Sequence, residues 1–123
     1  MARHNELGKL GEKIASEYLL TKGYLIREQN WRCGKVEIDI VAEVNCRLVI
    51  VEVKTRTDDF VDPLDAVDAK KQHNLVRAAN AYLNYTDLDM DVQFDIITII
   101  GTPEDYKLEH FPDAFYAPLK TYR

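Results

Sequence analysis

Two neighbouring apolar segments constrain the fold more than any other feature of the sequence. Residues 36–42 (VEIDIVA) and 48–56 (LVIVEVKTR) are rich in Val, Ile and Leu, which predicts two buried strands. The short connection between them predicts an antiparallel hairpin that turns at Asn45–Cys46. Charged residues nevertheless interrupt both segments, namely Glu37, Asp39, Glu52 and Lys54. The sequence therefore predicts a sheet that carries charges within its own strands.

The alternation of side chains along a strand gathers these charges. Glu37 and Asp39 share one face of the first strand, and Glu52 and Lys54 share one face of the second. A loop of two residues at Asn45–Cys46 places Asp39 directly opposite Glu52, and a loop of four residues keeps the same parity. A three-residue loop without a bulge would bury one set of charges in the core, at a cost of several kcal/mol per unpaired ion. We therefore expect an even loop and one shared charged face.

Adjacent carboxylates repel each other, so a proton or a cation must neutralise them. One interpretation is a structural ion network in which Lys54 pairs with the acids. The other is a Mg²⁺ or Mn²⁺ site, because these hard cations bind carboxylate and carbonyl oxygens together with water. Asp39, Glu52 and the carbonyl group of Val53 are the predicted ligands. Lys54 would then orient or help to deprotonate the attacking water and stabilise negative charge in the transition state.

The remaining segments predict an α/β protein with a mixed sheet flanked by helices, in the order α-β-β-β-α-β-β. Apolar residues recur at helical spacing over residues 5–21, and Asp62 and Pro63 predict the start of a long helix over residues 61–85. Further strands are predicted at the start of the sheet and after the second helix, over residues 24–30, 92–100 and 106–111. The final stretch, from His110 onward, has no periodicity, and we expect it to pack over the sheet or to contact a second copy.

Length and composition limit the class of protein. A chain of 123 residues with no linker predicts a single domain over residues 1–123. A net charge of −5 argues against a general nucleic-acid binder, but a nuclease needs acidic metal ligands and only local basic contacts. Cys33 and Cys46 lack the spacing of a zinc or redox site. The absence of a signal-like or long apolar segment predicts a cytoplasmic protein with no membrane partner.

Several motifs together resemble the YraN-like family of uncharacterised bacterial proteins, within the restriction-endonuclease-like PD-(D/E)xK nuclease superfamily. The matching segments are GKLGEKIASEYL, KGY, NWR, VEIDIV, VEVKTR and PLDAVDAKKQ, and they extend from about Gly8 to Ile100. Asp39, Glu52 and Lys54 match the superfamily's acidic and lysine positions. One departure is Val36, which replaces the family's glycine before the glutamate. The resemblance implies a restriction-endonuclease-like fold.

The resemblance also implies a function, namely metal-dependent hydrolysis of phosphodiester bonds, similar to that of Holliday-junction resolvases. The substrate would be DNA rather than RNA, and branched DNA is included. Such enzymes take a further glutamate from the first helix, and Glu12 matches that place. Glu37 is a secondary candidate, as is Gln72, although Val76 leaves the superfamily's Gln-x-x-x-Tyr motif incomplete. A non-catalytic nucleic-acid-binding or assembly protein that retains the fold is the alternative.

The expected contacts with nucleic acid are basic residues near these motifs, namely Arg32, Arg56, Lys70 and Lys71. Residues 54–77 hold as many acidic as basic residues, so a solvated helix face is an equally open interpretation. Trp31 either stacks on an unpaired base or closes the core. The role of Asp95 within an apolar strand is open. The small size and the family analogy suggest a homodimer.

Overall fold

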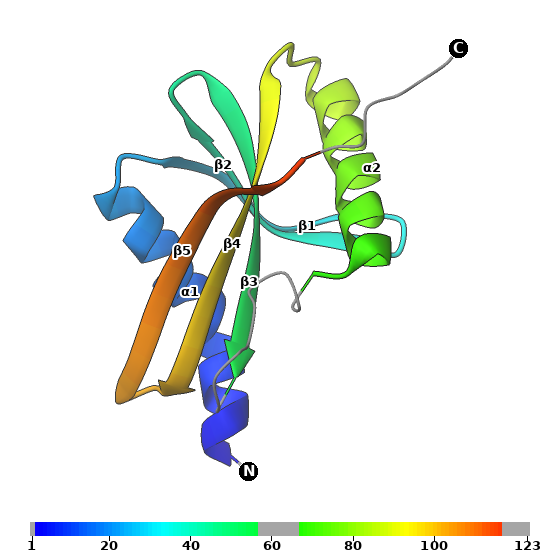
Figure 1. Cartoon of the computed structure of the whole chain (residues 1–123). Coiled ribbons are helices and arrows are strands. Elements are labelled where there is room, and N and C mark those ends of the chain that lie inside the picture. The colour runs from blue at the N-terminus through cyan, green and yellow to red at the C-terminus, as the bar shows by residue number, and fades with distance from the viewer. Residues whose placement is uncertain (1, 57–66, 117–123) are drawn as a thin grey trace.

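The computed structural model describes residues 2–56 and 67–116, with the side chains of the first helix described from Leu7 onward. The element order α-β-β-β-α-β-β is the predicted one (Figure 1). The elements are α1 (Ala2–Thr21), β1 (Leu25–Cys33), β2 (Val36–Val44), β3 (Arg47–Arg56), α2 (Ala69–Thr86), β4 (Asp91–Thr102) and β5 (Asp105–Phe115). None of these described helices is long and apolar enough to span a membrane.

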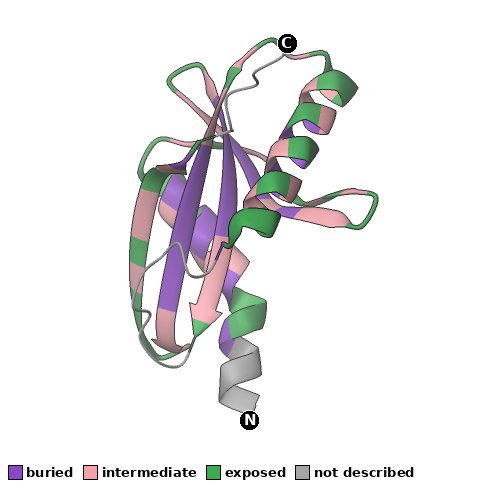
Figure 2. Cartoon of the chain, turned by 45° about the vertical axis from the view of Figure 1, so that its right-hand side comes forward, coloured by how far each residue is buried: buried purple, intermediate pink, exposed green. Residues whose placement is uncertain are grey.

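The five strands form one open mixed sheet in the order β1-β2-β3-β4-β5. The pair β3–β4 is parallel, and the other three pairs are antiparallel. The helices cover opposite faces, so the central strands are buried on both sides (Figures 1 and 2). Under α1 the core contains Leu7, Ala15, Leu19, Val49, Val51 and Ile97. Under α2 it contains Leu48, Ile50, Leu75, Ala79, Tyr82, Phe94 and Ile96.

The β2–β3 hairpin has the predicted two-residue loop. Asn45 and Cys46 both have positive φ angles, 51° and 62°, as a tight turn between twisted strands requires. The pairing Val44–Arg47 through Ile40–Val51 follows from this loop. The strand pairing ends there, so Asp39 and Glu52 lie immediately beyond the last paired residues. The loop therefore sets the parity that brings both carboxylates to one place.

Two boundaries differ from the prediction. The helix α2 begins at Ala69 with Asp68 as its N-cap, whose Oδ1 atom accepts a hydrogen bond from the Lys71 N–H at 2.9 Å. The predicted start at Asp62 and Pro63 lies outside the described residues. Strand β5 continues to Phe115, four residues beyond the strand predicted over residues 106–111, into the stretch where the sequence shows no periodicity. A register shift opposite Asp95 interrupts that strand and hides its periodicity in the sequence.

A glycine lets α1 approach the sheet closely beside the carboxylates. A Cβ atom placed on Gly11 would lie 2.6 Å from Cγ2 of Thr55 and 3.7 Å from Cγ1 of Val53. Any larger residue would push α1 away from β3 at Val53 and Thr55. The close approach brings Glu12, the next residue of the helix, to the edge of the charged site.

Candidate active site

Asp39 lies where β2 separates from β3. Its Oδ2 atom accepts a hydrogen bond of 2.9 Å from the backbone N–H of Val53. The side chain thus replaces the strand partner that Val53 lacks once the pairing has ended. Because both backbone groups of a strand residue point to the same side, the Val53 carbonyl is directed toward the same edge. The predicted ligands Asp39 and Val53 are therefore held next to each other by one hydrogen bond at the end of the hairpin pairing.

Glu52 is buried beside Asp39, with 3% of its surface exposed. Its Oε2 atom forms an ion pair of 2.7 Å with Nζ of Lys71, which reaches down from the first turn of α2. Its Oε1 atom is buried and has no hydrogen-bond partner in the described part of the chain. A buried carboxylate oxygen without a partner is costly, and such an atom calls for a proton or a cation.

The electrostatics of the site are those of crowded acids. Burial, followed by the charge of Asp39, raises the pKa of Glu52 to about 7. Burial likewise raises the pKa of Asp39, although the hydrogen bond from Val53 and the charge of Lys71 oppose the shift. Both carboxylates therefore hold protons more tightly than ordinary acidic groups do. A bound cation would remove this penalty.

Glu12 joins the same cluster from α1. Burial and the neighbouring charge of Asp39 raise the pKa of Glu12 to about 7, while hydrogen bonding with Asn30 lowers it in part. Glu37 contributes a further negative charge to Glu12 and to Asp39, and it also forms a weak ion pair of 3.7 Å with Arg32. The structure therefore brings together four predicted acids from three different elements.

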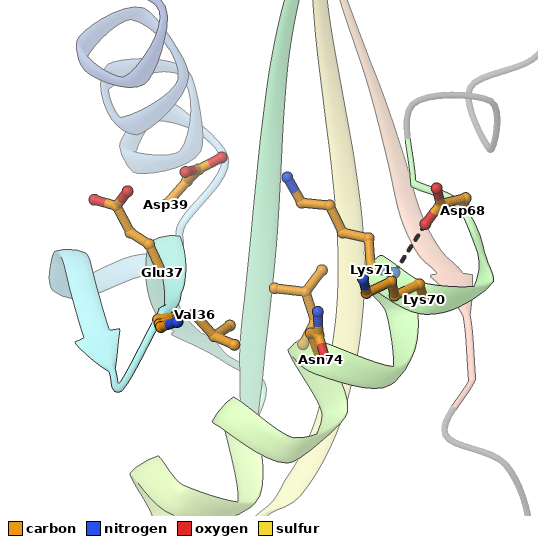
Figure 3. A pocket seen from close by; sticks show the side chains of 9 residues that line it. Val36, Glu37, Asp39, Asp68, Lys70, Lys71 and Asn74 are labelled. Carbon is orange, nitrogen blue, oxygen red and sulfur yellow. Dashed lines mark hydrogen bonds between the residues drawn. The ribbon is translucent and has the colours of Figure 1, made fainter.

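A pocket of about 410 Å³ opens beside these acids, between β2 and the start of α2 (Figure 3). Glu37 and Asp39 line the strand side, and Lys70, Lys71 and Asn74 line the helix side. Figure 3 shows the side chain of Lys71 extending across from α2 toward the strand side. Lys35 also lines the strand side, and Asp68 lines the helix side. The pocket therefore holds acids and lysines together, which suits a cation bound with an anionic ligand.

The residues present suit a hard divalent cation with few protein ligands. The described residues contain no ready-made cluster of three or more His, Cys, Asp or Glu ligands. Mg²⁺ and Mn²⁺ do not need one, because one or two carboxylates, a carbonyl group and water satisfy their octahedral geometry. The unpartnered Oε1 atom of Glu52 and the carboxylate of Asp39 provide such a set. Among the described residues that line the pocket, none has the sulfur or imidazole group that would favour zinc.

The other predicted residues lie in different places. Lys54 is half-buried on β3 and makes no ion pair within the described residues, so Lys71 occupies the position beside Glu52 that was expected for it. Gln72 is not brought to the acids, because its Nε2 atom donates to the Val67 carbonyl at 3.0 Å. Arg56 is exposed at the end of β3, and Lys70 is exposed at the rim of the pocket.

Trp31 packs against the core on the side of α2. It lies on β1, and its ring meets the ring of Tyr82 edge-on, with the centroids 5.1 Å apart. Tyr85 lies 6.0 Å from it at a tilted angle. The interpretation of Trp31 as a residue that closes the core therefore agrees with its contacts.

A second buried acid, Asp95 on β4, is fully satisfied by hydrogen bonds. Its Oδ2 atom lies 2.7 Å from Nε2 of His110 and accepts from the Tyr24 hydroxyl at 3.3 Å. Its Oδ1 atom accepts from Gln93 Nε2 at 2.9 Å and from the backbone N–H of Asp113 at 3.0 Å. Asp95 thus fills the gap that the bulge of β5 leaves in the β4–β5 pairing. The sequence signal was an acid in an apolar strand, but its partners come from distant elements.

Comparison with known proteins finds relatives that match almost the whole chain. The model of the uncharacterised protein family UPF0102 matches residues 11–99. A UPF0102 protein of Bacteroides thetaiotaomicron is 52% identical over 120 residues, covering 97% of this chain and 99% of the relative. A UPF0102 protein of Phocaeicola vulgatus is 48% identical over 120 residues, with the same coverage. UPF0102 protein FP2501 of Flavobacterium psychrophilum is 50% identical over 117 residues, covering 94% of this chain and 98% of the relative. The chain belongs to the uncharacterised protein family UPF0102.

Proposed function

We propose that this protein is a metal-dependent endonuclease in which Asp39 and Glu52 hold Mg²⁺ or Mn²⁺. The observation that carries the proposal is the buried Oε1 atom of Glu52, which has no partner in the described residues and lies beside the half-buried carboxylate of Asp39. A purely structural network would satisfy this atom, as the hydrogen bonds around Asp95 satisfy both of its oxygens. The resemblance to the PD-(D/E)xK nucleases adds independent support.

Each residue of the site has a separate role in the proposed reaction. Before a cation binds, Asp39 is held by the Val53 N–H and Glu52 by the Lys71 ammonium group, so both carboxylates are already positioned. When bound, the cation would act as a Lewis acid at the phosphate and lower the pKa of water. Glu12 has a pKa of about 7, close to the working pH, and suits the acceptance of a proton from the attacking water. Lys54 lies on the same strand as Glu52 and stays a candidate for stabilising developing negative charge.

The pocket supports a phosphodiester substrate. Lys35, Lys70 and Lys71 line it, and an anionic backbone that entered would meet these lysines while its scissile phosphate faced the acids. Arg32 on β1 and Arg56 on β3 are the further proposed contacts. We propose DNA as the nucleic acid on the basis of the resemblance.

The test is cleavage of end-labelled branched and single-stranded DNA in the presence of Mg²⁺ or Mn²⁺. We expect cutting by the wild type, and a loss of at least about a hundredfold in rate for Asp39→Asn and for Glu52→Gln. Glu109→Gln, a matched substitution at an exposed residue of β5, should cut normally. Binding of these DNAs without cutting by the folded wild type would instead favour a non-catalytic nucleic-acid-binding protein.

A further inference from the structure

The lysine beside Glu52 differs from an ordinary partner in a buried ion pair. The Glu52 side chain is 4% exposed, whereas the Lys71 side chain is 45% exposed. Glu52 therefore cannot leave the site, whereas Lys71 is able to turn its ammonium group into water once another cation faces Glu52. Lys71, and not Glu52, is therefore the mobile member of the pair.

The charges do not balance with Lys71 alone. One ammonium group faces Glu52 and the neighbouring Asp39, with Glu12 and Glu37 acting on Asp39 or on each other from α1 and β2. A single positive charge cannot neutralise two adjacent carboxylates, whereas a divalent cation would. Lys71 also bonds only the Oε2 atom, and the Oε1 atom beside it is without a partner among the described residues.

We propose that Lys71 is the resident counter-ion of the Asp39–Glu52 pair, and that a divalent cation replaces it on Glu52. This inference rests on the proposed function, since it requires that the pair binds a metal ion. The released ammonium group would turn into the adjoining pocket, which Lys71 already lines together with Lys35 and Lys70. Its charge, no longer neutralised by Glu52, would face the place where we expect a phosphate group of the substrate, and only once the cation is bound. Lys71 is therefore a positioning residue in the metal-free protein and a substrate contact in the loaded one.

The direct test observes the ammonium group itself. In ¹⁵N-labelled protein, the Nζ resonance of Lys71 is assigned by its loss in Lys71→Arg and followed during titration with Mg²⁺. We expect this resonance to shift at saturating Mg²⁺ by clearly more than that of Lys70, the adjacent lysine at the rim of the same pocket. A Lys71 resonance that stays in place while Mg²⁺ binds would overturn the inference and leave the proposed function intact.

Calorimetry provides the second measurement, at pH 8.5 so that the carboxyl groups are ionised. Removing a competing positive charge should make Lys71→Ala bind Mg²⁺ about fivefold more tightly than the wild type does. Lys70→Ala removes the same charge from the same pocket and should change the affinity less than about twofold. Weaker binding by Lys71→Ala would contradict replacement and indicate that Lys71 helps to hold the metal ion. If the wild type binds no Mg²⁺, the inference and the proposed function both fail.

Discussion

Asp39 and Asp95 have similar backbone surroundings and differ in the groups that face their carboxylates. Each lies where strand pairing is interrupted, and each accepts a hydrogen bond from a backbone N–H of the neighbouring strand, that of Val53 or that of Asp113. Around Asp95 the other neighbours are donors, and both oxygens are satisfied. Around Asp39 the other neighbours include acids, and the Oε1 atom of Glu52 has no partner within the described residues.

This difference separates a carboxylate that stabilises the fold from one that is able to bind a ligand. A buried acid whose acceptors are all occupied stabilises the fold and offers nothing to a ligand. A buried pair of acids with too few donors weakens the fold and keeps its binding capacity. We therefore expect substitutions around Asp95 to change stability, and substitutions of Asp39 and Glu52 to change metal binding and activity.

The largest expected effect is on stability at Asp95. Asp95→Ala leaves several buried donors without an acceptor, so the free energy of unfolding should fall by about 3–5 kcal/mol. Asp39→Asn keeps an oxygen for the Val53 N–H and removes a repelling charge, so it should change that free energy by less than about 1 kcal/mol. Urea denaturation of the metal-free proteins measures both values. A larger loss for Asp39→Asn would reverse the assignment of the two sites.

A pH dependence of stability should follow from Glu52. Its pKa in the folded protein is about 7, compared with an ordinary value of 4.5, so protonation favours the folded state. The metal-free wild type should therefore lose about 2–3 kcal/mol relative to Glu52→Gln as the pH rises from 4.5 to 8. Denaturation of both proteins across this range measures the difference. A constant difference would show that Glu52 titrates normally.

The smallest expected effect lies at the rim of the Asp95 cluster. The Tyr18 hydroxyl group lies 3.1 Å from Nδ1 of His110 and ends the chain of hydrogen bonds. Tyr18→Phe should cost about 0.5–1 kcal/mol of stability and leave metal affinity and DNA cleavage unchanged. Urea denaturation and the cleavage assay test the two parts. A loss of cleavage in a stable Tyr18→Phe protein would assign a functional role to this cluster.

Much of the fold was predictable because local patterns determine it. Segments rich in Val, Ile and Leu marked the hairpin strands, and the two-residue connection Asn45–Cys46 set the parity that unites Asp39 with Glu52. The start of α2 was predicted less well, since Asp62 and Asp68 are both good N-cap residues and sequence alone does not choose between them. The bulge near Pro112 and Asp113 hid the end of β5 for a similar reason, because it breaks the alternation.

The missing parts of the site depend on tertiary packing. The pairing of Lys71 with Glu52 requires α2 to dock on the sheet with its first turn above β3, and no spacing in the sequence encodes that contact. Lys54 was the natural choice from the sequence because it follows Glu52 on the same strand. The partners of Asp95 likewise come from the connection before β1, from β4 and from β5, so an acid in an apolar strand signalled a special role without identifying it.

The central claim is that Asp39 and Glu52 bind a divalent cation, and calorimetric titration with Mn²⁺ tests it most directly. Wild type, Glu52→Gln and the matched control Glu109→Gln are compared at pH 7.5. We predict one saturable site per chain in the wild type and in Glu109→Gln, and at least about a tenfold loss of affinity in Glu52→Gln. Equal affinity in all three proteins, or no binding by the folded wild type, would contradict the assignment of this carboxylate pair as a metal site.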